Sequence, residues 1–124
     1  MAERPDVTLR VTMLPRDTNA HGTIFGGAIL SHIDLAGGIA ASRQAQRKFV
    51  TRAMHGVEFI APVYVGDVVS FYTSVLRQGR TSITIKVSVE SEPGRQPRER
   101  VKLTEAEVIY VAIDETGKPT SLKS

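Results

Sequence analysis

One stretch of the chain combines a polar loop, a pair of glycines and a single carboxylate. The loop over residues 17–25 leads into Gly26 and Gly27, and an apolar run follows that carries Asp34. A helix that begins at glycines leaves its first backbone N–H groups open to an approaching ligand. A carboxylate about two turns further on is a poor choice for a helix that only packs. We therefore predict a site that pairs an oxyanion donor at Gly26 or Gly27 with an acid or base at Asp34.

The spacing of apolar side chains predicts the elements that position this site. Residues 7–14 alternate as a strand, and a helix is expected from Ile24 to about Arg47. At 100° per residue the helix has a broad apolar face and a small opposite face. We expect the apolar face to lie on a sheet and the small face to admit a ligand or a second surface. The apolar face holds Phe25, Ala28, Ile29, Ile33, Ala36, Ile39 and Ala40, and the small face holds Gly27, Ser31, Asp34 and Gly38.

Four further strands are predicted after the helix, over residues 50–60, 67–77, 82–90 and 100–113. The turn Gln78-Gly79-Arg80 predicts a hairpin, and the last strand changes phase, which suggests a β-bulge near Thr104-Glu105. Residues 114–124 form a polar tail. A sheet needs one face covered, and this order supplies one helix to cover it. We therefore predict an α+β fold in which a curved antiparallel sheet, paired largely as a meander, wraps around one long central helix. The strand over 82–90 is expected to face inward at Ile83, Ile85, Val87 and Val89.

Composition excludes several classes of protein. A chain of 124 residues with 41% hydrophobic residues suits one domain with its own core. Since there is no cysteine, disulfides and thiolate metal sites are excluded. The three histidines, at positions 21, 32 and 55, lack a tight metal-ligand spacing, so we expect no metal; the second belongs in the core. The polar N-terminus lacks a signal-peptide core and no run approaches ~18 apolar residues, so we expect a cytoplasmic protein that does not span a membrane.

The charge pattern speaks against a nucleic-acid partner. The net charge is +3, and the chain has no Trp. Few aromatic residues accompany its basic positions, whereas single-stranded nucleic acids bind where aromatic and basic side chains alternate. A short basic patch fits a small polyanion, such as a phosphorylated cofactor, better. That patch comprises Arg80, Arg95, Arg98, Arg100 and Lys102.

Four segments resemble the hotdog-fold acyl-CoA thioesterases. The first is the spacing Asn-x-x-Gly-x-x-Phe-Gly-Gly over residues 19–27, and the second is the helix carboxylate Asp34. The others are Phe-Ile-x-Pro-Val-x-Val-Gly-Asp over 59–67 and Gly-Arg-Thr-Ser over 79–82. The likeness runs from about Leu14 to Asp114 and is greatest to the bacterial acyl-CoA thioester hydrolases related to the cytosolic long-chain acyl-CoA hydrolases. It implies one hotdog acyl-CoA thioesterase domain over residues 1–124.

The resemblance also implies an active site shared between two subunits. Asp34 of one subunit and Asn19 of the other would face the thioester, and the backbone at Gly26 and Gly27 would polarise its carbonyl. The protein is then at least a homodimer, with a trimer of dimers and a tetramer as open alternatives. Residues implied to bind substrate are His21, Phe25, Arg80, Thr81 and Ser82, with Arg80 near the coenzyme phosphates.

Hydrolysis of a thioester needs an attacking oxygen and stabilisation of the developing oxyanion. Asp34 could activate a water molecule as general base, or attack directly to give an anhydride. Asn19 can orient that water, and one backbone donor at Gly26 or Gly27 would be worth ~3 kcal/mol. No metal or cofactor is required, because coenzyme A is part of the substrate.

Two other functions remain open. A hotdog hydratase or dehydratase would pair His21 with Asp34, but such enzymes usually carry prolines around the loop histidine, and this loop has none. A non-catalytic module that binds or senses acyl-CoA would keep Arg80 and the groove without needing Asp34. Release of free thiol from acyl-CoA distinguishes a hydrolase from both.

Overall fold

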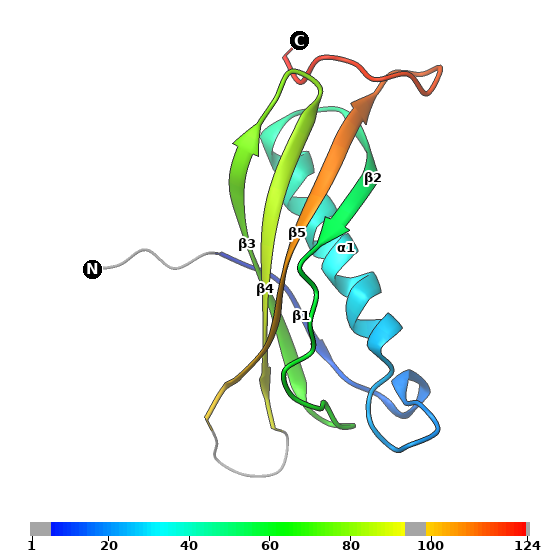
Figure 1. The fold of residues 1–124 in the computed structure, drawn as a ribbon, viewed down its shortest axis with the longest axis vertical. Coiled ribbons are helices and arrows are strands. Elements are labelled where there is room, and N and C mark those ends of the chain that lie inside the picture. The colour runs from blue at the N-terminus through cyan, green and yellow to red at the C-terminus, as the bar shows by residue number, and fades with distance from the viewer. Residues whose placement is uncertain (1–5, 94–98, 124) are drawn as a thin grey trace, which may run out of the picture.

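The computed structural model describes residues 6–93 and 99–123, in which an antiparallel sheet curves around one long helix (Figure 1). The sheet order is β1-β3-β4-β5-β2, so β1 and β2 are its two edges. A short 3-10 helix, η1, precedes α1 in the chain. The elements are β1 (Asp6–Thr12), η1 (Pro15–Asp17), α1 (Gly26–Gln44), β2 (Lys48–His55), β3 (Val68–Gln78), β4 (Ser82–Glu92) and β5 (Val101–Ile113).

The predicted meander holds for β3, β4 and β5, whereas β2 joins the far side of β5. The strand predicted over 50–60 begins earlier, at Lys48, and ends at His55. It stops there because Gly56 has a φ of +76°, which a strand does not continue. The remaining strand boundaries lie within a few residues of the predicted ones, as expected for boundaries read from pattern.

The helix is shorter at both ends than predicted. Ile24 forms an isolated bridge with Thr18, and its N–H donates to the carbonyl of Val63 at 2.8 Å, so it belongs to the loop. Phe25 is extended, with φ −62° and ψ 130°, and α1 begins at the glycine that follows. At the other end Ala45 is extended, which ends the helix at Gln44.

The core forms between α1 and the concave face of the sheet. Ile83, Ile85, Val87 and Val89 of β4 are fully buried, as predicted. The prediction was wrong for Phe25, which is 58% exposed because it precedes the helix, and for Ile39, which is half-buried at the edge of a groove. Small residues let the helix approach the sheet closely. The buried residues of α1 are Ile29, Ile33, Ala36, Gly37, Ala40 and Ala41.

Two irregularities in β5 pairing change the phase of the strands. Opposite β4, the register skips Leu103, one residue before the predicted bulge, so that Leu103 and Thr104 are both buried. Opposite β2, Thr51 pairs with Tyr110 and the register then skips Arg52. An extra residue of this kind re-aims the side chains beside it. The second bulge lies next to the candidate site.

Residues 114–123 are more ordered than the predicted polar tail. The N–H of Thr120 donates to the carbonyl of Ala112 at 2.8 Å, and the N–H of Leu122 donates to that of Arg80 at 2.9 Å. Figure 1 shows this segment lying beside the turn between β3 and β4. Hydrogen bonds from the Thr116 hydroxyl and from the backbone of Lys118 and Thr116 lower the pKa of Asp114. No helix in the described residues is long and apolar enough to cross a membrane.

Candidate functional site

An open groove of about 770 Å³ runs along the small face of α1. Three of the four predicted small-face residues, Ser31, Asp34 and Gly38, line it, whereas Gly27 does not, and Asp34 is half-buried there. Among the described residues that line the groove, Asp34 is the one carboxylate. The others are Leu35, Ile39, Ser42 and Arg43 of α1, Phe49 and Thr51 of β2, and Tyr110 of β5.

Two residues of the sheet hold Asp34. The hydroxyl of Thr51 donates to Oδ1 of Asp34 at 2.6 Å, and the hydroxyl of Tyr110 donates to its backbone carbonyl at 2.7 Å. Thr51 and Tyr110 are directly opposite each other in the β2–β5 pairing. One cross-strand pair therefore fixes both the carboxylate and the helix backbone beneath it.

Tyr110 reaches the helix because Gly37 has no side chain. A Cβ at Gly37 would lie 2.2 Å from the Tyr110 hydroxyl oxygen, far inside contact distance, whereas one at Gly38 would lie 3.9 Å from the ring. Burial, and then the nearby Asp34 carboxylate, raise the pKa of Tyr110. Its hydroxyl therefore keeps its proton and remains a donor.

The side chain of Asn19 closes its own loop. Its Nδ2 donates to the hydroxyl of Thr23 at 2.9 Å, and its Oδ1 accepts from the backbone N–H groups of His21 at 2.8 Å and Thr23 at 3.2 Å. Gly22 adopts a φ of +86°, which favours glycine at this turn. His21 is exposed at the tip. The loop is thus built largely from its own hydrogen bonds.

Two aromatic rings flank the start of α1. A Cβ at Gly27 would lie 2.3 Å from Cε2 of Phe25, and one at Gly26 would lie 3.3 Å from Cε2 of Phe59. Packing against the ring of Phe25 is therefore enough to explain why glycine stands at position 27, without a ligand. The N–H of Ala28 donates to the carbonyl of Phe25 at 2.9 Å. In residues 6–93 and 99–123, no hydrogen bond takes up the N–H of Gly26 or Gly27.

Within one chain the predicted site residues lie at three heights along α1. The Asn19 loop and the two glycines are at its start, and Asp34 is further along. At 1.5 Å per residue, Asp34 lies about 10 Å along the axis from Gly27. The β3–β4 hairpin lies near the far end, where Gln78 Nε2 donates to Gln44 Oε1 at 3.5 Å.

The hairpin residues predicted to bind substrate differ in exposure. The side chain of Arg80 is exposed, and Thr81 and Ser82 are half-buried. Backbone hydrogen bonds close this turn, with the N–H of Gly79 donating to the carbonyl of Ser82 at 2.8 Å and that of Ala112 to the carbonyl of Thr81 at 2.8 Å. Of these three predicted residues, Arg80 is the one whose side chain is exposed.

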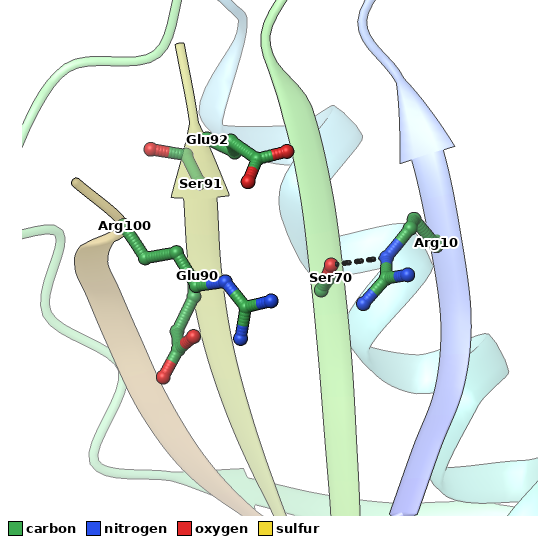
Figure 2. Close-up of a pocket in the computed structure, with 6 residues that line it drawn as sticks. All are labelled: Arg10, Ser70, Glu90, Ser91, Glu92 and Arg100. Atoms are coloured by element: carbon green, nitrogen blue, oxygen red, sulfur yellow. Dashed lines mark hydrogen bonds between the residues drawn. The ribbon is translucent and has the colours of Figure 1, made fainter. Parts of the chain in front are cut away.

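A second pocket, of about 70 Å³, lies on the face of the sheet opposite α1 (Figure 2). Arg10 Nε donates to the hydroxyl of Ser70 at 2.8 Å, and Arg100 Nη1 donates to the hydroxyl of Tyr72 at 3.3 Å. Two arginines and two glutamates balance its charge, so it does not favour an anion. Its lining residues are Arg10, Ser70, Glu90, Ser91, Glu92 and Arg100.

The remaining basic and histidine predictions have separate outcomes. Arg95 and Arg98 of the predicted basic patch lie outside the described residues, and Lys102 is hydrogen-bonded to Glu105. His32 is half-buried and not in the core as predicted, although Nδ1 donates to the carbonyl of Ala28 at 2.7 Å and its ring stacks on the buried Phe71. No cluster of three or more His, Asp or Glu side chains that could hold a metal ion occurs in the part of the chain the structure describes.

Sequence reasoning missed Thr51, Tyr110 and Gly37. No local pattern marks the first two, since they meet Asp34 only through the strand order and register. Gly37 carried a signal, because glycine inside a helix is unfavourable and calls for a packing reason.

Comparisons with known proteins identify the family and confirm the fold. A family model for the thioesterase superfamily matches residues 21–98. The acyl-CoA thioester hydrolase YciA of Salmonella typhimurium is 44% identical over 122 residues, covering 94% of this chain and 90% of that protein. The hexameric thioesterase y2039 from Yersinia pestis superposes with a TM-score of 0.91 at 41% identity, covering 100% of both chains. HI0827, a hexameric broad-specificity acyl-coenzyme A thioesterase, gives 0.91 at 38% identity, covering 100% of this chain and 85% of that one. The predicted fold class is confirmed, and the chain belongs to the hotdog-fold acyl-CoA thioester hydrolases of the thioesterase superfamily.

Proposed function

We propose that this protein hydrolyses acyl-CoA thioesters to a free acid and coenzyme A, with Asp34 delivering the attacking oxygen. The observation that carries the proposal is the placement of Asp34, a lone carboxylate held by Thr51 and Tyr110 on a groove. As general base, Asp34 takes a proton from water while the oxygen bonds to the carbonyl carbon. The C–S bond then breaks and the thiolate leaves with that proton.

Asp34 can also act as the nucleophile. The carboxylate then displaces the thiolate, and water hydrolyses the resulting anhydride. A single turnover in H₂¹⁸O identifies the anhydride route when ¹⁸O enters the protein, whereas ¹⁸O in the fatty acid fits direct attack by water or opening of the anhydride at its acyl carbonyl. Direct attack by water puts ¹⁸O into the fatty acid, whereas water that opens the anhydride at the Asp34 carbonyl leaves ¹⁸O in the protein.

The second half of the site comes from a second subunit. Because Gly27 and Asp34 of one helix lie about 10 Å apart along the axis, a single thioester carbonyl does not bridge them. A twofold partner supplies the helix start instead, with the free N–H of Gly26 or Gly27 of the partner subunit facing the oxyanion. Asn19 of the partner subunit can still donate, since its Nδ2 carries two hydrogens and Thr23 uses one.

The remaining substrate contacts follow from exposure. Phe25 and His21 are exposed beside the helix start and would contact the pantetheine or acyl part. Arg80 is exposed at the hairpin, and with Thr81 and Ser82 would face the coenzyme phosphates. Because the two solved relatives described above are hexamers, we propose a trimer of dimers for this chain rather than an isolated dimer or a tetramer.

Thiol release from a series of acyl-CoAs of increasing chain length tests this function. We expect turnover that EDTA leaves intact. Binding of acyl-CoA without thiol release would instead support a sensing module. Hydration of enoyl-CoA without hydrolysis would support the dehydratase alternative with His21. Loss of hydrolysis on EDTA treatment, recovered with a divalent ion, would contradict the metal-free mechanism.

A mixing experiment tests the shared site. Asp34→Ala and Asn19→Ala proteins, each expected to keep only a small residual rate, are unfolded and refolded together. Half of the dimers are then mixed and hold one intact site, so roughly a quarter of wild-type activity should return if the sites are independent. Mixed dimers without activity would mean that Asn19 and Asp34 act within one chain, or that the two sites depend on each other.

A further inference from the structure

We propose that Tyr110 is a positioning residue for Asp34, with its hydroxyl holding the helix backbone at Asp34 where hydrolysis requires the carboxylate. The inference rests on the proposed role of Asp34. It adds a residue of β5, far away in sequence, to the machinery of the site.

The first observation is the hydrogen bond itself. The Tyr110 hydroxyl donates to the Asp34 carbonyl at 2.7 Å, and Tyr110 is only 2% exposed. Inside a helix, a carbonyl is already paired with the N–H four residues later. The bond from β5 is therefore an extra tie between sheet and helix. Of the backbone carbonyls along α1, the one that accepts this extra bond belongs to Asp34, the residue that carries the carboxylate.

The second observation is the glycine that makes room for the tie. A Cβ at Gly37 would lie 2.2 Å from the Tyr110 hydroxyl oxygen and 2.9 Å from Cζ. Glycine is a poor residue for a helix interior compared with alanine. Gly37 therefore weakens the helix locally, but its missing side chain leaves the space through which the Tyr110 hydroxyl reaches Asp34.

The third observation is register. Thr51 and Tyr110 lie directly opposite each other, and the bulge at Arg52 follows at once. Thr51 holds the carboxylate at Oδ1 while Tyr110 holds the backbone. Two fixed points on one residue restrict both the position of its Cα and the direction of its side chain. Reacting groups that shift by about 1 Å can lose about 100-fold in rate.

Tyr110→Phe tests the inference because it keeps the buried ring and removes the hydroxyl. We expect kcat to fall by about 10-fold to 100-fold, while KM changes by less than about twofold. The same substitution in an Asp34→Ala background should leave the residual rate unchanged, because no carboxylate remains to be positioned. A general loss of structure would lower both backgrounds alike.

Tyr72→Phe is the matched control. Tyr72 is also buried, at 8% exposure, and its hydroxyl accepts from Arg100, which lines the pocket on the opposite face of the sheet. Tyr72→Phe should lower the melting temperature by about as much as Tyr110→Phe does, and it should keep wild-type kcat. Gly37→Ala provides a second route, since it displaces the hydroxyl while Tyr110 is retained, and should lower kcat in the same way.

The outcomes separate this inference from the function on which it rests. Wild-type kcat in folded Tyr110→Phe overturns the inference, and so does an equal fractional loss in the Asp34→Ala background. Wild-type kcat in folded Asp34→Ala overturns the proposed function itself. A loss that depends on Asp34 supports both.

Discussion

The middle of α1 and its start are held in opposite ways. Asp34, in the middle, receives hydrogen bonds from β2 and β5, which join the helix from distant parts of the chain. Asn19, before the start, makes side-chain hydrogen bonds only to His21 and Thr23 in the described structure. The acid is therefore positioned by strands distant in sequence, whereas the Asn19 side chain is held by residues of its own loop.

This difference suits the proposed division of the site between two chains. The region around Asp34 is complete in one subunit, with a buried tyrosine beneath it and a groove above. The helix start presents the rings of Phe25 and Phe59, which are 58% and 44% exposed. Exposed aromatic side chains that gather at one place are typical of a surface that binds a partner or ligand. A preformed loop can then dock against an acid that is already in place.

Removing the acid should have the largest effect. Asp34→Asn keeps the size of the side chain and removes the base, so kcat should fall by about 1,000-fold. The protein should remain folded, because Asp34 is half-buried on the groove side and not in the core. The measurement is thiol release together with thermal unfolding. Asp114→Asn, the same chemical change in an exposed turn, should keep kcat; wild-type kcat in folded Asp34→Asn would remove Asp34 from the mechanism.

Substitutions at Asn19 separate a donor to the substrate from a loop-closing side chain. Asn19→Asp keeps the oxygen that accepts from His21 and Thr23 and loses the Nδ2 donor, whereas Asn19→Ala loses both. We expect each to lower kcat by about 100-fold, the scale for one lost donor, with the larger fall in melting temperature for Asn19→Ala. Near-normal kcat in Asn19→Asp would mean that Asn19 only shapes the loop.

The same contrast decides what the sequence could predict. Strict alternation placed Ile83 to Val89 in the core, and helical periodicity placed Asp34 on the small face, because both depend on local geometry. Phe25 was misplaced because the helix was expected to begin too early. Thr51 and Tyr110 could not be paired from the sequence, since their register depends on β2 crossing to the far side of β5. The Asn19 loop was recognised from its motif, while its hydrogen bonds required the structure.

Two adjacent glycines test how tightly the sheet holds the middle of the helix. Gly37→Ala should lower the free energy of unfolding by about 2 kcal/mol, because its Cβ would overlap the Tyr110 hydroxyl. Gly38→Ala should raise it by up to about 1 kcal/mol, since its Cβ would make ordinary contact at 3.9 Å and alanine favours helix. Urea unfolding of both variants gives the comparison. Equal effects would show that Tyr110 does not press on the helix at Gly37.

Protonation of Asp114 should give the smallest effect. It tests whether a turn held by its own hydrogen bonds opens independently of α1. Hydrogen bonds from Thr116 and Lys118 lower the pKa of Asp114 below its ordinary value of 3.8. A carboxyl whose pKa is depressed on folding stabilises the turn above its unfolded pKa, and this contribution is lost as the pH falls through the folded pKa. We expect the protection of the Thr116 and Lys118 amides from exchange, measured relative to their intrinsic rates at each pH, to fall below about pH 4 while protection near Asp34 stays unchanged. In Asp114→Asn the acid dependence should disappear. A simultaneous loss of protection near Asp34 would mean that the turn and the middle of the helix open together, and that local closure does not make a segment independent.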